Sequence, residues 1–337
     1  MQILMLGGTR FLGCHLVEAA LNQGHEVTLF NRGQTHPGWF AQVERLQGDR
    51  DGDLSALEGR HWDAVIDTCG YVPRLVRASA ELLAARVEHY TFISTASVYA
   101  DPSRHGMDEE SPVGTLEDER LEDVNGNTYG PLKVLCEQAA EAAMPGRVLT
   151  IRSGLIVGPF DPSDRFTYWP VRIAQGGEVL APAGPGKRIE LIDVRDLAEW
   201  IVRMAGARAT GIYNASGARE ALTMGYLLDE CRDLSAADAR ITWVSEAFLK
   251  ANGVEPFSDM PLWEPEGEDG LATINASKAL NAGLTLRPLA DTIRDTLAWH
   301  RTRPQDTPLT KGIGHEREQA LLQTWHAQAA AEPCPST

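Results

Sequence analysis

The first 33 residues alternate strand, glycine turn, helix and strand, and this pattern constrains the fold more than any other feature of the chain. Met1–Leu6 is a short apolar run that suits a buried parallel strand. The turn Gly7–Gly13 follows at once, then apolar residues at helical spacing in Cys14–Gln23 and a second strand-like run, His25–Phe30. Glycines let backbone amides approach a phosphate, and the helix that follows directs unpaired N–H groups toward it. The stretch therefore predicts a dinucleotide-binding unit.

Strand-like and helix-like segments continue to alternate after this opening. The expected strands are Asp63–Asp67, Tyr90–Ser94, Arg147–Arg152 and Gly211–Ala215, and the expected helices are Pro73–Ala85, Tyr129–Ala143 and Asp193–Ala205. Strands separated by helices predict an α/β fold with a Rossmann-type, doubly wound parallel sheet and a smaller, mostly C-terminal substrate lobe. Ligands of such sheets bind beyond the carboxyl ends of the strands.

The character of the chain changes after Gly158-Pro159, where loops and short, irregular elements replace the regular alternation. We predict an NAD(P)-binding Rossmann domain over residues 1–160, with 187–216 returning to it. The substrate lobe then takes 161–186 and 217–302, and 303–337 forms a C-terminal helical extension. The last residues, 333–337, are expected to fray.

The composition favours a cytoplasmic globular protein. Hydrophobic residues make up 43% of the chain, and no apolar run approaches the roughly 20 residues that span a bilayer. The N-terminus enters a strand directly, without the basic segment or cleavage site of a secretory signal. The five cysteines are scattered and form no CxxC or Cys/His cluster, which predicts free thiols and no bound metal.

The chain is strongly acidic, with 31 basic against 47 acidic residues and a formal net charge of −16. A field of this sign repels nucleic acid phosphates, so no nucleic-acid partner is expected. A small anionic ligand remains compatible, because a few arginines in a local pocket can oppose the global charge.

Three residues far apart in the sequence are expected to meet at the carboxyl edge of the sheet. Thr95 follows a strand directly, and Tyr129 and Lys133 stand at i and i+4 of one helix, so their side chains share a face. Pro131 is tolerated there because the first helical turn has no use for its missing N–H. These positions place Tyr129 near the mouth of the sheet.

This combination suits proton transfer at a carbonyl or alcohol. A tyrosine titrates near about 10, and a neighbouring ammonium group favours the phenolate, which lowers the pKa toward neutrality. A hydroxyl such as that of Thr95 can hydrogen-bond the oxygen that alternates between carbonyl and alcohol. The alternative to a catalytic role is that Tyr129 and Lys133 are surface residues that share a helix face without any chemical function.

Over about residues 1–300 the chain resembles the extended short-chain dehydrogenase/reductase superfamily, in its NAD-dependent epimerase/dehydratase family. The resemblance implies that Thr95, Tyr129 and Lys133 are catalytic, and that Gly48-Asp49-Arg50 is the adenine-contacting turn. The segments 151–159 and 192–198 match later motifs of the family. Related enzymes often dimerise through two sheet-flanking helices, so a homodimer is a possible assembly.

The implied cofactor contacts come from the glycine turn, the end of the strand His25–Phe30, the turn Gly48-Asp49-Arg50, the loop after the strand Asp63–Asp67, and the motif lysine. They are Gly7, Gly8, Thr9, Arg10, Phe11, Leu12, Gly13, Asn31, Arg32, Asp49, Arg50, Cys69 and Lys133. NAD-specific members usually place an acid where this chain has Asn31-Arg32, and Arg10 replaces the middle glycine of the turn. Arginines suit a 2′-phosphate, so we predict NADP(H) in preference to NAD(H).

The chain departs from the family at two substrate positions. Family dehydratases carry an Asp-Glu pair where this chain has Ala96-Ser97, which argues against sugar dehydration by that route. Leu155 replaces an asparagine that contacts the substrate diphosphate in many nucleotide-sugar members. The predicted substrate contacts are Tyr71, Ser97, Arg165, Tyr168 and Arg188, with Phe160 and Trp169 as further candidates for a pocket.

Three functions stay open. The first is an NADP(H)-dependent oxidoreductase acting on a small carbonyl or alcohol, with Tyr129 as general acid and base. The second is a redox-neutral nucleotide-sugar epimerase with tightly bound NAD. The third is RNA binding, because the GGTRF turn and the NRG ending resemble chloroplast stem-loop-binding proteins of the superfamily. The retained Tyr129 and Lys133 and the acidic charge favour the enzymes over the third function.

Overall fold

A computed structural model describes residues 1–217, 222–304 and 307–331 of the chain. The chain forms two compact units. Unit 1 consists of residues 1–156, 191–217 and 273–286, and unit 2 of the described parts of 157–190, 218–272 and 287–337. The expected frayed end, 333–337, lies outside the described residues.

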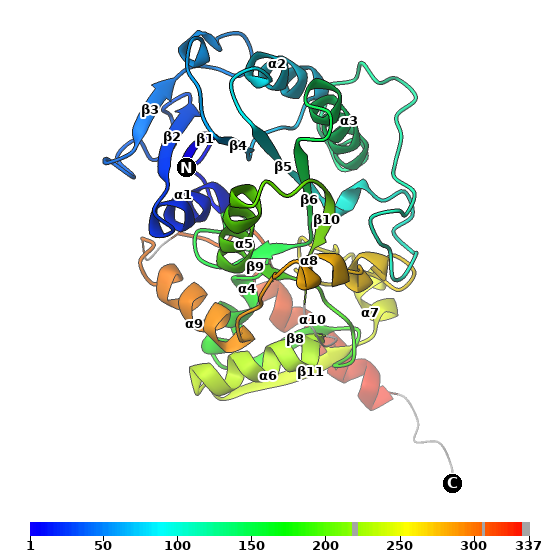
Figure 1. The fold of residues 1–337 in the computed structure, drawn as a ribbon. Helices are drawn as coiled ribbons and strands as arrows, with labels where there is room; N and C mark the ends of the chain where they lie inside the picture. Colours follow the sequence, from blue (N-terminus) through cyan, green and yellow to red (C-terminus); the bar gives the residue numbers. More distant parts are fainter. Residues whose placement is uncertain (218–221, 305–306, 332–337) are drawn as a thin grey trace. The chain divides into compact units, whose positions relative to one another are not determined.

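Unit 1 is built on a seven-stranded parallel sheet (Figure 1). Its strands are β1 (Gln2–Leu6), β2 (Glu26–Asn31), β3 (Glu44–Gln47), β4 (Ala64–Asp67), β5 (His89–Thr95), β6 (Val148–Ser153) and β10 (Gly211–Ala215). They are ordered β10-β6-β5-β4-β1-β2-β3, and every pairing is parallel. The chain moves outward in opposite directions from β1 and β4, and in sheets of this kind ligands bind in the crevice at the carboxyl ends of such a strand pair.

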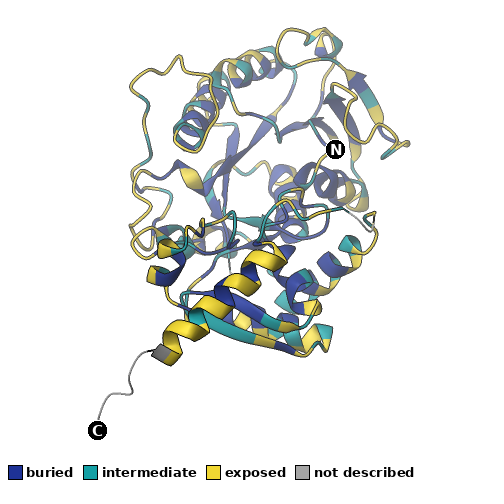
Figure 2. Cartoon of the chain, turned by 180° about the vertical axis from the view of Figure 1, so that it is seen from behind, coloured by how far each residue is buried: buried dark blue, intermediate teal, exposed yellow. Residues whose placement is uncertain are grey.

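Helices cover both faces of this sheet. They are α1 (Leu12–Asn22), α2 (Pro73–Leu83), α3 (Tyr129–Ala143), α5 (Val194–Gly206) and α8 (Ser277–Asn281), with short 3₁₀ turns η1 (Ser55–Leu57) and η2 (Ala96–Val98). One core cluster joins α1 and α5 to the sheet, and a second joins α2 and α3 to it. The five inner strands of the sheet are therefore buried on both faces, as the dark strands of Figure 2 show, while the edge strands β3 and β10 are only partly buried.

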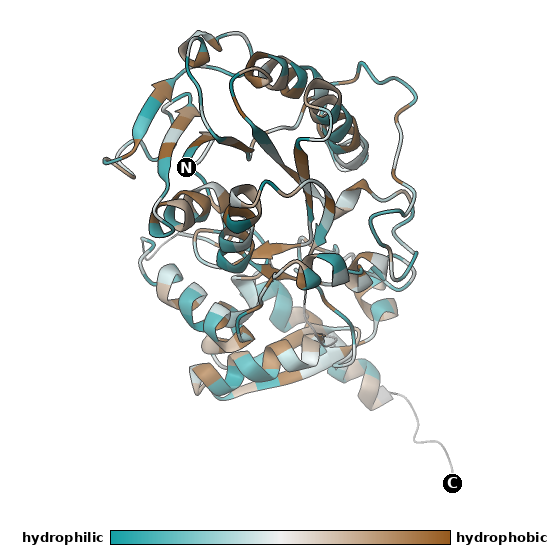
Figure 3. Ribbon diagram, viewed as in Figure 1, coloured by the Kyte–Doolittle hydropathy of each residue, from teal (hydrophilic) through white to brown (hydrophobic). Residues whose placement is uncertain are grey.

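The hydropathy of the strands explains this burial. After Gln2, β1 is a continuous apolar run, and β4 is apolar up to Asp67, whereas β3 at the sheet edge is more polar and largely teal in Figure 3. β5 is fully buried although it mixes apolar with polar residues, and Asp67 is a charged residue that is fully buried at the end of β4.

Unit 2 has a parallel strand pair, β8 (Gly177–Pro182) with β11 (Ala239–Val244). Its helices are α4 (Tyr168–Ala174), α6 (Met224–Ser235), α7 (Glu246–Ala251), α9 (Leu289–His300) and α10 (His315–Ala331). The short strand β9 (Ile192–Asp193) belongs to unit 1, and the short elements β7 (Ile156–Val157) and η3 (Asp269–Thr273) lie where the chain passes from one unit to the other. No helix in the described ranges has the length and apolar character that a membrane crossing requires.

The predicted α/β fold and its parallel sheet are confirmed. The predicted helix Tyr129–Ala143 matches α3 and the predicted strand Gly211–Ala215 matches β10 at both ends, and the other predicted strands and helices of unit 1 differ by one or a few residues. The bounds of the units differ from the predicted domains in two respects: residues 273–286 belong to unit 1, and the extension after residue 302 belongs to unit 2. The reason is that α8 packs beside β10, while α10 packs on β8.

Candidate active site

The glycine turn after β1 has a backbone that only glycine adopts easily. Gly7 and Gly8 have φ angles of 105° and 86°. A side chain at Gly8 would overlap Leu29, and a Cβ at Gly13 would lie 2.9 Å from the Cα of Gly8. The turn and the first residues of α1 therefore pack backbone against backbone at Gly8 and Gly13, and residues 7–13 form a cradle of backbone groups.

The N–H groups of this cradle are available to a ligand. Within the described residues, no partner accepts a hydrogen bond from the N–H groups of Gly8, Thr9, Arg10 or Phe11. The turn is attached to the sheet by the Gly7 N–H, which donates to the Phe30 carbonyl at 2.9 Å. Free donors ahead of a helix N-terminus suit a phosphate, so these residues fit the diphosphate of a dinucleotide.

At the end of β2, where NAD-specific members of the family usually have an acidic residue, this chain has Asn31 and Arg32. The Asn31 amide donates to the Gly7 carbonyl at 2.9 Å and accepts from the Gly33 N–H at 2.9 Å, so it holds the turn together. Arg10 and Arg32 are exposed, and no described residue forms an ion pair with either. Both guanidinium groups can therefore meet an anion at this edge.

The turn after β3 separates two predicted cofactor residues. Asp49 is exposed, and its carboxylate accepts from the Asp51 N–H at 3.1 Å. The Arg50 side chain instead turns inward and donates twice to Asp67, at 2.5 Å each. An adenine contact at this turn thus depends on Asp49 and the backbone, and it stays a prediction.

The start of α3 lies against the turn that follows β5. Gly130 is buried there, and a Cβ on it would overlap the Ser97 carbonyl oxygen. The Thr95 hydroxyl, at the end of β5, accepts from the Ser97 N–H at 3.2 Å and donates to the Ser97 hydroxyl at 3.2 Å. This packing brings Thr95 and Tyr129 to the same end of the sheet, as the sequence predicts.

Lys133 lies one turn further along α3 and is only 3% exposed. Its ammonium group donates to the Ile93 carbonyl at 2.6 Å and to the Gly70 carbonyl at 2.7 Å. These carbonyls belong to β5 and to the loop after β4, so the lysine joins the two segments. An ammonium group has three protons, and the third is left for a phenol or a hydroxyl in the crevice.

Burial lowers the pKa of Lys133 from its usual 10.5 to about 8, because a charge loses its hydration inside the protein. The charges of Asp67 and Glu137 act in the opposite direction, and that of Arg50 adds to the lowering. The ammonium group also lies 4.2 Å from the ring centre of Phe92 and 5.4 Å from that of Tyr71. Lys133 can therefore change its charge near neutral pH.

Tyr71 stands beside Tyr129, with 6.5 Å between the ring centres. It is 48% exposed, and partial burial together with the nearby Tyr129 raises the pKa of its phenol. It is thus a protonated phenol at the mouth of the crevice. Cys69, two residues earlier, donates to the Leu6 carbonyl at 3.4 Å and is held next to the glycine turn.

The remaining predicted substrate residues lie in unit 2, apart from Ser97. Tyr168 and Trp169 pack in its core, with ring centres 4.9 Å apart and Tyr168 3% exposed, so packing accounts for both. Arg165 donates to the Ser163 hydroxyl at 3.0 Å, and Arg188 is exposed. Their contact with a substrate stays a prediction.

Two buried polar groups behind the site were not predicted. One is the pair of Arg50 and Asp67. The other is Glu137, which receives hydrogen bonds from Ser94 at 2.5 Å and from Arg152 at 2.8 Å and so ties α3 to β5 and β6. The sequence did contain a signal for both: Asp67 and Arg152 are charged residues within otherwise uncharged strands. A charge buried in a strand needs a partner of opposite charge, so each of them predicts an ion pair.

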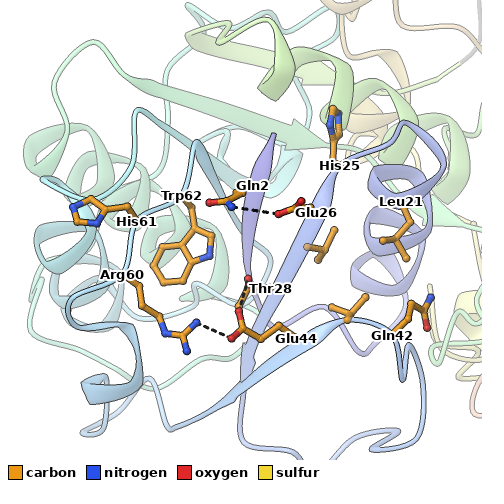
Figure 4. Close-up of a pocket in the computed structure, with 12 residues that line it drawn as sticks. Gln2, Leu21, His25, Glu26, Thr28, Gln42, Glu44, Arg60, His61 and Trp62 are labelled. Carbon is orange, nitrogen blue, oxygen red and sulfur yellow. Dashed lines mark hydrogen bonds and ion pairs between the residues drawn. The ribbon is translucent and has the colours of Figure 1, made fainter.

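One cavity of about 520 Å³ lies at the opposite ends of the strands (Figure 4). Gln2, Glu26 and Glu44, the first residues of β1, β2 and β3, line it. Its polar groups bond one another: Arg60 and Thr28 both donate to Glu44, at 2.8 and 3.2 Å. In the described part of the chain no group of three or more His, Cys, Asp or Glu residues could hold a metal ion.

Comparison with known proteins identifies the family. A model of the NAD dependent epimerase/dehydratase family matches residues 3–79 and 65–216, which include the glycine turn, Thr95, Tyr129 and Lys133. The chain belongs to this family. The resemblance stated from the sequence is thereby confirmed.

Two curated relatives of this epimerase/dehydratase family member are each 28% identical to it. One is the chloroplast stem-loop binding protein of 41 kDa b of Arabidopsis thaliana, aligned over 64% of this chain and 58% of the relative. The other is the epimerase family protein SDR39U1 of Bos taurus, aligned over 59% of this chain and 68% of the relative. The chain thus spans less than two thirds of the length of the plant protein.

Solved epimerase structures share its fold. The UDP-glucose 4-epimerase of Thermus thermophilus, in complex with NAD, has a TM-score of 0.64 at 18% identity, over 90% of this chain and 100% of the other. The Bordetella bronchiseptica enzyme WbmH, in complex with NAD+, has a TM-score of 0.65 at 16% identity, over 90% and 98%. At such identities the likeness concerns the fold.

Proposed function

We propose that the protein transfers a hydride between a nicotinamide cofactor and an alcohol or carbonyl carbon, with Tyr129 as general acid and base. The observation that carries this proposal is the buried Lys133, whose ammonium group lies beneath the crevice on the same helix face as Tyr129. Family membership supports an enzyme of this superfamily.

The proposed roles follow from the side chains present. The N–H groups of residues 8–11 would hold the diphosphate of the cofactor, and the third proton of Lys133 would meet a ribose hydroxyl or the Tyr129 phenol. The bound nicotinamide supplies or accepts the hydride. Tyr129 gives a proton to the substrate oxygen in one direction and removes it in the other, and the Thr95 hydroxyl orients that oxygen.

We further propose NADP(H) as the cofactor, because Arg10 and Arg32 are exposed and Asn31 has no charge to repel a 2′-phosphate. Two solved structures of the same fold favour the other choice, since both are complexes with NAD. Arg32→Asp should weaken NADPH binding at least tenfold and leave NADH binding within about threefold in fluorescence titrations. Equal NADPH affinity in this variant and the parent protein would refute the preference.

A second candidate is a redox-neutral epimerase, in which the same hydride is removed and returned on a tightly held cofactor. The epimerases among the solved structures of this fold favour it. It needs the same Thr95, Tyr129 and Lys133. The two candidates therefore differ in how firmly the cofactor is held and not in the acid–base group.

The first test is to denature the purified protein and identify the nucleotide that it releases, followed by NADPH exchange. Retained NAD+ that resists exchange would support the epimerase, whereas an empty site that binds NADPH reversibly would support the reductase. Tyr129→Phe should then lower the turnover of any substrate found by at least about 10² and leave nucleotide binding unchanged. Undiminished turnover in this variant would refute the role of Tyr129.

RNA binding is the third candidate, because one relative is named for stem-loop binding. The net charge of −16 argues against it, since association with RNA depends on cations that neutralise phosphates. A gel-shift assay with stem-loop RNA at physiological salt should show no retained complex. A retained complex would favour RNA binding over the enzyme.

A further inference from the structure

A buried ion pair lies behind the predicted adenine turn and the candidate active site. Each nitrogen at the end of the Arg50 side chain donates to one oxygen of Asp67, at 2.5 Å, and Asp67 is 0% exposed. Arg50 also donates to the Ser79 hydroxyl at 2.8 Å and to the Leu75 carbonyl at 3.3 Å. The guanidinium is thus committed to the interior and not to a ligand.

The same carboxylate holds the loop after β4. The Tyr90 phenol donates to Asp67 at 2.7 Å, and the Cys69 N–H donates to it at 3.1 Å. The next residue, Gly70, offers the carbonyl that accepts from Lys133 at 2.7 Å. Gly70 has little room to move, because even a Cβ on it would overlap the ring of Phe92. An unbroken series of contacts therefore leads from Arg50 to the ammonium group of Lys133.

We infer that Arg50 and Asp67 are positioning residues: through the Cys69–Gly70 loop they hold the carbonyl oxygen that orients Lys133. This inference rests on the proposed function only in treating Lys133 as the active-site lysine. It also explains why a charge is buried at the end of β4, where an apolar residue would pack without needing a partner.

The pair also acts on Lys133 through its charges. The groups that face this ammonium are Cys136 and Glu137 from α3, Asp67 and Arg50 of the pair, and the rings of Tyr71 and Phe92. The negative Asp67 favours the charged lysine and the positive Arg50 disfavours it, so the two charges act in opposite directions. Removal of one charge alone must therefore move the pKa of Lys133, in a direction that depends on which charge is lost.

The test is an NMR titration of the protein labelled with ¹³C at the lysine ε-carbon. Lys187, Lys250, Lys278 and Lys311 serve as internal references, and Lys133→Arg identifies the Lys133 signal. In Asp67→Asn the pKa of Lys133 should fall below its value of about 8, because an uncompensated Arg50 cation remains. In Arg50→Gln it should lie at least about half a unit above that of Asp67→Asn. Equal values in both variants, or the reverse order, would overturn the inference.

A matched control removes a buried ion pair elsewhere. Glu318 and Arg172 in unit 2 form a pair that is 0% and 7% exposed, with 2.7 Å between the charged atoms. Glu318→Gln should lower the melting temperature but leave the Lys133 titration as in the parent protein. A shift of Lys133 in this control as well would mean that destabilisation alone moves it, and would overturn the inference.

If either single variant fails to fold, the apolar double variant Arg50→Met/Asp67→Leu provides the test, since apolar pairs often replace buried ion pairs without loss of stability. Amide hydrogen exchange over residues 68–71 should accelerate at least tenfold, because the Cys69 N–H loses its acceptor. Unchanged exchange there would show that the pair does not hold the loop.

Nucleotide binding separates this inference from the proposed function. If the Lys133 titration shifts as expected but NADPH and NADH affinities show no dependence on it between about pH 7 and 9, the positioning pair stands and the cofactor role of Lys133 fails. If affinity follows the titration in the parent protein but the variants share one pKa, the proposed function stands and the positioning pair fails.

Discussion

Lys133 is a buried cation next to the candidate active site. Two backbone carbonyls hold its ammonium group, while burial opposes its charge and lowers its pKa to about 8. A lysine that served only to stabilise the fold would be better placed at the surface with a full charge. A pKa of about 8 leaves the group mostly charged at neutral pH and lets it lose its charge in mildly alkaline solution.

The pH dependence of stability tests this environment. Because the folded pKa of about 8 is lower than the usual 10.5, the unfolded chain binds more protons between these values, and stability rises with pH there. The parent protein should gain about 2 kcal/mol over Lys133→Met between about pH 7 and 9.5. The measurement is the unfolding free energy from urea titrations of both proteins. A difference that stays constant with pH would contradict the lowered pKa.

At the scale of elements, the N-terminus of α3 decides whether the three candidate catalytic residues meet. Its first turn contains Gly130, which lets the helix backbone touch the Ser97 carbonyl in the turn after β5. Lys133 then reaches β5 at the Ile93 carbonyl. Gly130 and Lys133 thus join α3 to the end of β5 at two positions, and these contacts fix where the helix begins, at Tyr129.

Gly130→Ala should separate α3 from this turn. The added methyl group would overlap the Ser97 carbonyl, so we expect a loss of about 1–3 kcal/mol in stability. Turnover should fall about tenfold to a hundredfold, because a small displacement of Tyr129 spoils the geometry of proton transfer. Thermal unfolding and kcat would be measured together.

Gly126→Ala is the control for this prediction, because Gly126 has open space around its Cα and lies just before the same helix. It should leave both quantities close to those of the parent protein. Equal effects in the two variants would mean that the contact with Ser97 does not place α3.

At the scale of the whole molecule, the C-terminal helix is part of unit 2 and not an appendage. Glu318 on α10 is fully buried, and it accepts from Arg172 at 2.7 Å and from the Leu180 N–H at 3.0 Å. Trp325 further along α10 packs edge-on against Phe248, with ring centres 5.0 Å apart. Unit 2 therefore completes its core with residues that follow position 302.

Glu318→Ala should destabilise the protein by about 3–5 kcal/mol, because it leaves the buried Arg172 charge without a partner. The exposed Glu316, on the same helix, provides the control, and Glu316→Ala should change stability by less than about 0.5 kcal/mol. Differential scanning calorimetry of the three proteins would show this. Similar melting of both variants would mean that α10 is not anchored by Glu318.

The strands and helices of unit 1 could be predicted because the residues that specify each of them are close together in the sequence. An apolar run followed by glycines and a helical period predicts β1, the turn and α1, and the i to i+4 spacing predicts that Tyr129 and Lys133 share a face of α3. Unit 2 could be predicted less well, since its elements are short and β8 pairs with β11 across about 60 residues. No pattern within a few residues predicts a pairing between strands so far apart in the sequence.

The sequence by itself determined the class of fold, the glycine turn after β1 and the positions of Tyr129 and Lys133 on one helix, because backbone preferences and side-chain periodicity act within a few residues. Only the tertiary structure decided which charges are buried together. Arg50 illustrates the difference: beside Asp49 in the sequence it suggests a ligand contact, yet it pairs with Asp67 in the interior. A buried carboxylate requires a cation, and which cation reaches it depends on how β3 and β4 pack and not on their order in the chain.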